Sequence, residues 1–331
     1  MVMGRTLIRL AVGAAVLLLL VAAPLAAEAQ PAAKVFHVAW LSASSTFPEA
    51  VDAFRHGLQE FGWVEGRNIL IVYRNAEGQL ERLPEMAAEL VRMKVDVILA
   101  TSPAPLAAAR KATQTIPIVM VFGPDPVEAG LVVGLARPGG NITGLTSLSA
   151  DLSPKQLELL NEMVPGLSRV AVLWNPTNPW HASGVKRLEV AARALRVRLQ
   201  IVGVRKPDEL DAAFVAMARE RADAILSLPD GLTFAHRVRL AALAAKHRLP
   251  TMNGLIEYTE AGGLASYWPN STEMFRRAAG YVHRILSGSR PGDLPIEQPT
   301  KFEFVINLKT ARALGLTMPS SPLLRADRVI E

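Results

Sequence analysis

Short apolar runs alternate along the chain with longer stretches in which apolar residues recur every three or four positions. The short runs are continuously apolar, which is typical of strands buried on both faces of a sheet. The longer stretches predict amphipathic helices. Regular strand–helix alternation predicts an α/β protein with parallel sheets that carry helices on both faces. The first predicted strands are Val35–Leu41, Ile69–Tyr73, Val95–Ala100 and Pro117–Phe122, and the helices between them are Glu49–Phe61, Leu83–Met93 and Ala104–Ala112.

This pattern pauses at a turn-rich stretch, residues 137–141, and then starts again. A weak internal echo supports a repeat, because Val-Asp-Val-Ile-Leu-Ala at residues 95–100 resembles Ala-Asp-Ala-Ile-Leu-Ser at residues 222–227. We therefore predict two α/β units. The strands predicted for the second unit are Val170–Trp174, Leu199–Val204 and Ala224–Leu228.

The first 29 residues have the pattern of a secretion signal. Arg5 and Arg9 give a basic start, an uncharged apolar run follows from Leu10 to Leu25, and a small-x-small sequence ends at Ala29. We expect cleavage near Ala29 and a periplasmic mature protein without stable membrane insertion. The alternative is an uncleaved membrane anchor, because the apolar run approaches the length of a spanning helix.

Composition narrows the class of protein. With 331 residues, 50% of them hydrophobic and 20% charged, the chain suits one large or two ordinary domains and is too apolar for a disordered protein. The absence of cysteine excludes disulfide scaffolds, cysteine-bound metals and thiol nucleophiles, and it suits an oxidising periplasm. The formal net charge of +6 raises nucleic acid or an anionic surface as a partner.

Polar residues stand before prolines directly after several predicted strands. In a parallel sheet such positions lie at the carboxyl ends of the strands, which is the edge where open α/β sheets bind ligands. If each proline opens a helix, free N–H groups and the helix dipole favour an anionic group there. Helix capping alone explains any single site equally well, but several along one edge favour a binding cleft. The sites are Thr101-Ser102-Pro103, Asp125-Pro126 and Asn175-Pro176-Thr177-Asn178-Pro179.

Motifs of common enzymes are missing from the sequence. It has no Gly-x-Ser-x-Gly elbow, no His-Glu-x-x-His, no phosphate-binding loop and no dinucleotide fingerprint. Its six histidines have no metal-ligand spacing, so we expect neither a metal nor a cofactor. Asp125 and Asp230 follow predicted strands and could form an acid–base pair, although one of them receiving a ligand ammonium or hydroxyl is the simpler interpretation.

Tryptophans occupy informative positions in a chain with few aromatic residues. Trp40 and Trp174 lie in the first strand of each predicted unit, and Tyr267-Trp268 follows the apolar run Gly263–Ser266. Core packing is the ordinary role of a tryptophan in a sheet. At the edge of a cleft, the same side chain would offer a flat face to a ring.

Several longer motifs resemble those of the TrpX-like ABC transporter substrate-binding protein family, and the resemblance covers essentially all of residues 34–331. The motifs are Asp-Pro-Val-Glu-Ala-Gly-Leu at 125–131, Ala-Arg-Pro-Gly-Gly-Asn-Ile-Thr-Gly at 136–144, Gly-Trp-Val-Glu-Gly-Arg-Asn at 62–68 and Pro-Thr-Lys-Phe-Glu-Phe-Val-Ile-Asn-Leu-Lys-Thr-Ala at 299–311.

This resemblance implies a type 1 periplasmic-binding fold: two Rossmann-like lobes with parallel sheets, joined by a three-crossover hinge and closing on a ligand. Lobe one would be residues 35–145 plus 264–288, and lobe two 146–263 plus 289–319, with a tail at 320–331. The return of the helix Met274–Leu286 to lobe one is implied by the family alone.

The resemblance also implies that strand-end residues line the cleft. From the first lobe and the crossover these are Ser42, Ser44, Thr101, Ser102, Asp125 and Thr146, and from the other side Asn175, Asp230, Asn253 and Glu257, with Tyr267 beside them. Relatives usually carry glycine after the Ser-Tyr pair. Trp268 at that position would narrow or extend the pocket.

We therefore expect the periplasmic substrate-binding component of an ABC importer. It would be a monomer that captures a small molecule, with an amino acid as the leading candidate, and delivers it to the permease and ATPase subunits. Ligand binding coupled to hinge closure involves no bond chemistry, so we do not expect an enzyme. The alternatives are a periplasmic ligand-sensing subunit of a signalling system, or an exported α/β hydrolase with Asp125 and Asp230 as acid and base.

The basic charge fits this expectation. Cleavage near Ala29 removes two arginines and one glutamate and leaves +5, and residues 169–260 alone hold 14 basic and 9 acidic residues. Arg193, Arg196 and Arg237 lie on predicted helices without interleaved aromatic residues, a spacing typical of solvated faces. This pattern disfavours nucleic acid as a partner and leaves a small molecule.

Overall fold

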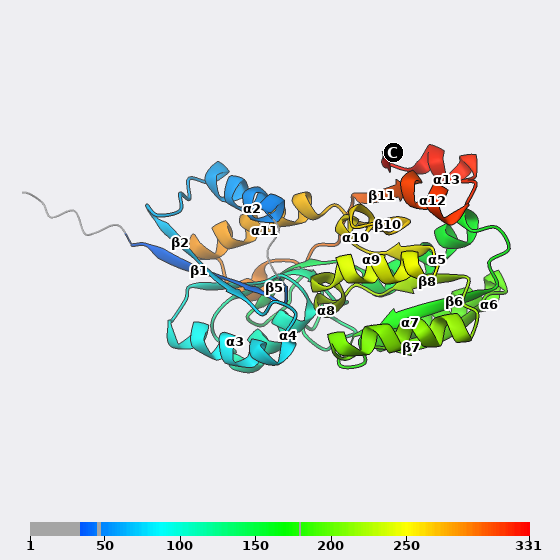
Figure 1. Cartoon of the computed structure of the whole chain (residues 1–331). Helices are drawn as coiled ribbons and strands as arrows, with labels where there is room; N and C mark the ends of the chain where they lie inside the picture. Colours follow the sequence, from blue (N-terminus) through cyan, green and yellow to red (C-terminus); the bar gives the residue numbers. More distant parts are fainter. Residues whose placement is uncertain (1–33, 45–47, 179) are drawn as a thin grey trace, which may run out of the picture. The chain divides into compact units, whose positions relative to one another are not determined.

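The computed structural model describes residues 34–44, 48–178 and 180–331. Residues Val35–Glu331 form one compact unit. The predicted signal segment, residues 1–29, lies outside the described residues. Among the residues that are described, no helix is long and apolar enough to cross a membrane. The unit Val35–Glu331 contains two sheets flanked by helices (Figure 1), which confirms the predicted α/β class.

The first sheet and its helices are called the first lobe below. Its elements are β1 (Phe36–Ser42), β2 (Ile69–Asn75), β3 (Val97–Ala100), β4 (Ile118–Gly123), β5 (Ile142–Thr146), α2 (Pro48–Glu60), α3 (Leu83–Arg92), α4 (Pro103–Ala112) and α11 (Ser271–Leu286). All five strands are parallel, in the order β2-β1-β3-β4-β5. Alternate residues of β1 face opposite sides of the sheet: Val38 and Trp40 pack with α2 and α11, whereas Ala39 and Leu41 pack with α3 and α4.

The second sheet and its helices are called the second lobe. Its strands are β6 (Arg169–Trp174), β7 (Arg198–Gly203), β8 (Ala224–Ser227), β9 (Thr251–Asn253), β10 (Ala265–Pro269), β11 (Phe302–Asn307) and β12 (Arg328–Ile330). Its helices are α5 (Ser149–Met163), α6 (His181–Leu195), α7 (Leu210–Arg219), α8 (Gly231–Ala235), α9 (Arg237–Lys246), α10 (Ile256–Glu260), α12 (Leu308–Leu314) and α13 (Ser320–Arg325). The strand order is β12-β11-β10-β9-β8-β6-β7, and only the pair β10–β11 is antiparallel.

Three segments connect the lobes: the one after β5, the one between β10 and α11, and the one before β11. Helix α11 packs along α2, as the resemblance implied. Residues 264–269, which the resemblance put in the first lobe, instead form β10, because this strand pairs with β9 and β11. The resemblance put residues 289–297 in the second lobe, but they contact the first lobe. Leu294 and Ile296 belong to the core of the first lobe, and Glu297 forms a β-bridge with Leu145.

Each strand and helix named from the apolar pattern is present, with ends that agree within two residues. The expectation for the prolines is partly wrong. Pro103 opens α4, but Asp125-Pro126 leads into a turn and α6 begins only at His181, after the turn at Asn175-Pro176. In both turns the Asp or Asn side chain accepts N–H groups two or three residues ahead, a local bond that needs no helix.

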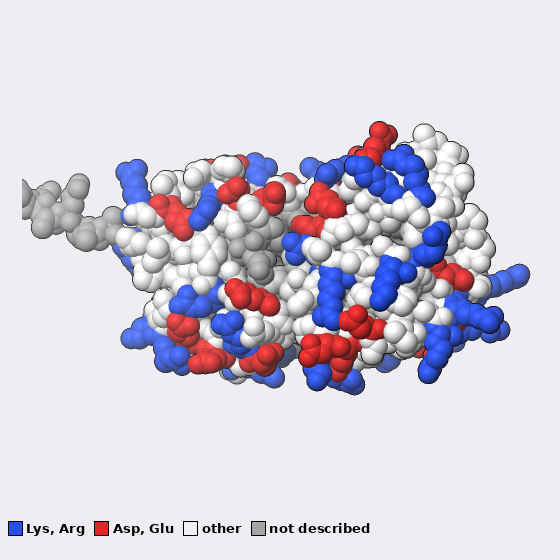
Figure 2. Space-filling view, in the orientation of Figure 1, with Lys and Arg blue, Asp and Glu red and all other residues white. Residues whose placement is uncertain are grey.

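Basic and acidic side chains are interspersed over the face shown in Figure 2. Many arginines form surface ion pairs, for example Arg55 with Glu65 and Arg276 with Glu60. Such exposed pairs contribute roughly 0–1 kcal/mol each. The basic excess of the sequence is thus found largely on the solvated surface.

Strands β4 and β5 approach each other unusually closely. The pairing register shifts between Met120 and Gly123, and Phe122 adopts a positive φ of 55°. Opposite this irregularity, Gly144 has φ +121°, and a Cβ placed on it would lie 2.3 Å from the Met120 carbonyl oxygen. Only glycine fits this position, and the irregular end of β4 that presents Phe122 depends on it.

Gly144→Ala should therefore lower the free energy of unfolding by at least about 2 kcal/mol, because both the φ angle and the space exclude a methyl group. Denaturant unfolding followed by circular dichroism measures the change. Gly134→Ala is the matched control, because no atom lies within 4 Å of its Cβ position. Equal stability of the two variants would contradict the argument.

Candidate functional site

A cavity lies where the carboxyl ends of strands from both lobes meet. It encloses about 780 Å³ of space, part of it open to solvent, and residues of both lobes line it. The first lobe contributes the ends of β1, β3 and β4, and the second lobe contributes the segment that follows β8.

One side of the cavity carries hydroxyl groups. Four predicted residues, Ser42, Ser44, Thr101 and Ser102, line it together, and Ser147 joins them. The Ser42 hydroxyl donates to the Ser44 carbonyl (2.8 Å) and the Thr101 hydroxyl donates to the Leu41 carbonyl (3.2 Å). Each of these hydroxyl oxygens can still accept a bond from a ligand.

Ser102 occupies the N-cap position of α4, yet its side chain makes no capping hydrogen bond. The positive end of this ten-residue helix therefore faces the hydroxyl side of the cavity. Because Pro103 and Pro105 lack amide hydrogens, Ala104 is the only one of the first three helical residues with an N–H group. An anionic group at this place would be bound mainly by hydroxyls and the dipole.

Aromatic side chains form another part of the lining, called the aromatic side below. Trp40 stacks on Phe275 with ring centroids 4.9 Å apart and an interplanar angle of 12°. Phe122 contacts Phe275 edge-on at 5.7 Å and lies 6.2 Å from Trp268. Trp40 is only 1% exposed and belongs to the core, and it also lines the cavity. The indole N–H groups of Trp40 and Trp268 are buried without a partner in the protein.

The second lobe contributes a buried carboxylate, Asp230. Its Oδ1 accepts from Asn175 Nδ2 (3.1 Å) and from the Leu232 amide (3.0 Å), and its Oδ2 accepts from Asn178 Nδ2 (3.0 Å). Asp230 is 8% exposed and lines the cavity, and all three of these donors are neutral. A buried anion held only by neutral donors favours a cationic group of a ligand.

His181 contacts the backbone of the residues that surround Asp230, a role that its sequence position did not indicate. The Asn175 amide donates to its Nδ1 (3.2 Å), so in the neutral ring Nε2 carries the proton and faces the Pro229 carbonyl (3.1 Å). Burial lowers the pKa of His181, although the nearby Asp230 opposes the shift. Protonation of His181 Nδ1 would place its N–H against the N–H of the Asn175 amide, and Asn175 is one of the residues that hold Asp230.

Three predicted site residues serve the backbone instead. Asp125 Oδ1 accepts from the amides of Val127 and Glu128 (both 2.9 Å), and the Thr146 hydroxyl donates to the Gly123 carbonyl (3.0 Å) and the Pro124 carbonyl (2.9 Å). Asn175 does not line the cavity but orients Asp230 and its own turn.

The other three also lie off the cavity. Asn253 donates to Thr251 (3.2 Å), and Tyr267 stacks on Phe302 with centroids 5.7 Å apart. Glu257 lines a neighbouring cavity, and burial raises its pKa. Sequence reasoning missed Asn178, Phe122 and Phe275 as lining residues. Asn178 belongs to a strand-end motif, and Phe122 ends a predicted strand, so strand-end position was the usable signal for both.

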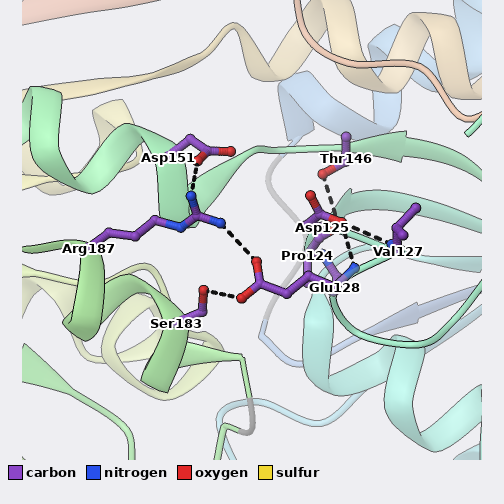
Figure 3. Close-up of polar contacts among 8 residues, drawn as sticks. All are labelled: Pro124, Asp125, Val127, Glu128, Thr146, Asp151, Ser183 and Arg187. Atoms are coloured by element: carbon purple, nitrogen blue, oxygen red, sulfur yellow. Dashed lines mark hydrogen bonds and ion pairs between the residues drawn. The ribbon is translucent and has the colours of Figure 1, made fainter.

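An ion pair connects the two lobes (Figure 3). Glu128, in the turn after β4, accepts from the Ser183 hydroxyl (2.6 Å) and from Arg187 Nη2 (2.9 Å), both on α6. Arg187 also pairs with Asp151 of α5 (2.7 Å). Among the ion pairs of the described residues, Glu128–Arg187 alone joins elements of the two sheets. The Ser183 hydroxyl and Arg187 lower the pKa of Glu128.

The pH dependence of stability should report His181. Its native pKa lies below the unfolded value of about 6.5, so its stabilising contribution is present above that pH and is lost as the pH falls below it, by up to about 1.4 kcal/mol per pH unit. In thermal or denaturant unfolding between pH 7.5 and 5.5, His181→Gln should flatten this loss, whereas His56→Gln, at an exposed histidine, should keep it. An unchanged slope in His181→Gln would rule out the assignment.

Glu128→Gln should shift the lobes towards a more open arrangement, because it removes the charge that pairs with Arg187. An exposed pair contributes at most about 1 kcal/mol, a change of roughly fivefold in the equilibrium. Since the chain has no cysteine, spin labels on Val133→Cys and Val190→Cys, both exposed, give the distance distribution between the lobes without background.

Acid should have the same effect on the labelled wild-type protein. The pKa of Glu128 is lowered, so its contribution is present above the ordinary glutamate value of about 4.3 and lost as the pH falls through the lowered pKa. Asp151→Asn, which removes only the partner of Arg187 within the second lobe, is the control. Identical distributions for Glu128→Gln and wild type would show that the pair does not bias closure.

Comparison with known proteins gives consistent matches. A family model described as ABC transporter substrate binding protein matches residues 38–330. The tyrosine-binding protein of Clostridioides difficile strain R20291 is 28% identical over 269 residues, which cover 81% of this chain and 77% of that protein.

Solved structures agree in fold. A conserved domain protein from Vibrio cholerae superposes with a TM-score of 0.83 at 30% identity, covering 89% of this chain and 100% of that one. An ABC domain in complex with L-Trp from Streptococcus pneumoniae gives 0.80 at 23% identity, covering 90% and 100%. The arrangement of two lobes with parallel sheets is that of type 1 periplasmic binding proteins.

Proposed function

The chain belongs to the ABC transporter substrate-binding protein family, whose members bind rather than transform their ligands, and from this premise we propose that it captures an aromatic amino acid in the cavity between its lobes. The observation that carries the proposal is the division of one cavity into a hydroxyl side, an aromatic side and a buried carboxylate. These are the three groups needed for the carboxylate, the ring and the ammonium of such a ligand.

The ligand carboxylate would bind at the hydroxyl side. Ser44 and Ser102 offer hydroxyl donors there, whereas the Ser42 and Thr101 hydroxyls already donate to backbone carbonyls. The positive end of α4 adds a favourable field. No Lys or Arg lines the cavity among the described residues. A bulky polyanion would therefore be poorly compensated, and a single carboxylate suits the site.

Asp230 would receive the ammonium group. The neutral amides of Asn175 and Asn178 hold the carboxylate in place, and a cationic ligand group would complete its surroundings. Hydrogen bonds to charged groups contribute about 1.5–3 kcal/mol, so this contact would distinguish amino acids from simple carboxylic acids.

The aromatic side would take the ligand's side chain. Trp40, Phe122 and Phe275 form a continuous buried surface, and aromatic pairs contribute about 0.5–1.5 kcal/mol beyond burial. The unpartnered Trp40 indole N–H gives a donor to a polar atom on a ring. The C. difficile relative is a tyrosine-binding protein, which supports an aromatic ligand here.

In the cell, the protein would act as the exported receptor of an importer. The signal-like segment before residue 30 supports export to the periplasm, and the family supports delivery to an ABC permease and its ATPase. We expect a monomer whose lobes close over the ligand and open again at the permease.

Binding of L-tyrosine, L-tryptophan and L-phenylalanine to the purified mature protein tests the proposal by isothermal titration calorimetry and thermal shift. A ligand at a hundred times its Kd should stabilise the protein by about 2.7 kcal/mol. Asp230→Asn should weaken binding about 10- to 100-fold, whereas 3-(4-hydroxyphenyl)propionate, which lacks the ammonium, should bind both proteins equally weakly.

Asp125→Asn provides the matched control, because this aspartate also follows a strand, β4 of the first sheet, but only supports a turn. It should bind like the wild type. No binding of any of the three amino acids would refute the proposed ligand class. Equal binding by Asp230→Asn and wild type would refute the role of Asp230.

A further inference from the structure

A second cavity adjoins the proposed ligand cavity at Trp268, which lines both. The second encloses about 940 Å³, part of it open to solvent. Among the described lining residues, Trp268 is the single member common to both. Trp268 is thus the wall residue that the two cavities have in common.

The surroundings of Trp268 keep this wall in place. The residue is 5% exposed and sits on β10 directly opposite Glu303 of β11. Its Cε3 would lie 3.1 Å from a Cβ on Gly254, so the neighbouring backbone is closely packed against the ring. On the side of the ligand cavity it lies next to Phe122. Rotation of the indole out of this position would need these neighbours to move.

The chemistry on the two sides of Trp268 is opposite. The ligand cavity is aromatic beside it, whereas the second cavity contains Glu49, Glu257, Glu260 and Glu303. The second cavity has one arginine, Arg328, and that arginine pairs with Glu260 (2.9 Å). Asn270 donates to Glu303 (3.1 Å), whereas Glu257 Oε2 is buried without a partner in the protein. The second cavity therefore has a surplus of negative charge.

We propose that Trp268 is a specificity-determining residue, which ends the ligand cavity at the ring of the bound amino acid and closes off the acidic cavity behind it. The proposal rests on the proposed function, because the ring of the ligand is placed on the aromatic side. It limits the substrate to a single aromatic residue without a long arm on its ring. It also predicts which new ligand a variant without the indole would accept: an aromatic amino acid whose ring carries a cationic arm.

Three probes separate length from charge: L-phenylalanine, 4-(aminomethyl)-L-phenylalanine and 4-(carboxymethyl)-L-phenylalanine. Wild type should bind the first at least 100-fold more tightly than either extended probe. Trp268→Gly joins the two cavities, so the penalty for the aminomethyl probe should fall below tenfold. The carboxymethyl probe should stay at least tenfold weaker than the aminomethyl probe, because it meets the carboxylates. Calorimetry gives the three dissociation constants.

Two control variants show whether the effect belongs to the wall. Trp268→Phe retains a ring and should still exclude both extended probes, whatever its affinity for L-phenylalanine. Trp174→Gly makes the same substitution at a tryptophan that lines neither cavity and should keep the wild-type ratios among the probes. If Trp268→Gly rejects the aminomethyl probe as strongly as wild type does, the proposal is wrong.

A second measurement separates this proposal from the proposed function. If wild type binds none of the aromatic amino acids, the ligand class fails, but the wall can still be examined in ligand-free crystals of wild type and Trp268→Gly. Two separate cavities in wild type and one continuous cavity in the variant would support the wall. Collapse of neighbouring side chains into the gap, or continuous cavities in both proteins, would overturn it.

Discussion

Burial of the Asp230 carboxylate among neutral donors is the constraint on which the rest of the site depends. The two asparagine amides that hold it follow β6, whereas Asp230 itself follows β8, so the carboxylate ties two neighbouring strand ends together. A buried anion is costly unless its hydrogen bonds are complete, so this network must be well ordered. His181 can support it only as a neutral ring. The same carboxylate gives the cavity its one negative group among the described lining residues and hence its preference for a cationic ligand group.

The segment that carries Asp230 also brings the two lobes together. Gly231, next to Asp230, lies so close to the first lobe that a Cβ on it would be 2.4 Å from the Ala43 Cβ. Such an approach is possible only for glycine, and it brings the carboxylate towards the hydroxyls after β1 and β3. The Glu128–Arg187 pair connects the lobes at another place, between the turn after β4 and α6. Because this pair is exposed, it contributes little energy and can open reversibly, which suits a receptor that must release its ligand.

The sequence predicted the strands that are buried on both faces, because a short and continuously apolar run such as Pro117–Phe122 is typical of a strand inside a parallel sheet. It did not predict β5, in which glycine and threonine interrupt the pattern, or the three-residue strands β9 and β12. For the site, the strand-end pattern pointed to Thr101, Ser102 and Asp230, and the resemblance added Ser42 and Ser44; all five line the cavity. Asp125, taken from the pattern, and Thr146, taken from the resemblance, lie off the cavity. A polar side chain at a strand end can equally well satisfy its own backbone, and sequence spacing does not distinguish the two uses.

The aromatic half of the cavity shows why tertiary structure had to decide the rest. Trp40 comes from β1, Phe122 from the irregular end of β4, and Phe275 from a helix that follows the second sheet in the chain but packs on the first. No local sequence pattern brings these three residues together. They meet because the segment between β10 and α11 returns the chain from the second lobe to the first. Trp268 stands just before that crossing, so its indole can reach the first-lobe aromatic cluster while its backbone stays paired in the second sheet. A residue in this position contacts both lobes at once, so a change there alters the depth of the cavity without disturbing the hydroxyl groups or Asp230. In the proposed complex, different parts of the chain therefore set the length of the ligand and the recognition of its head group, and the two can vary independently.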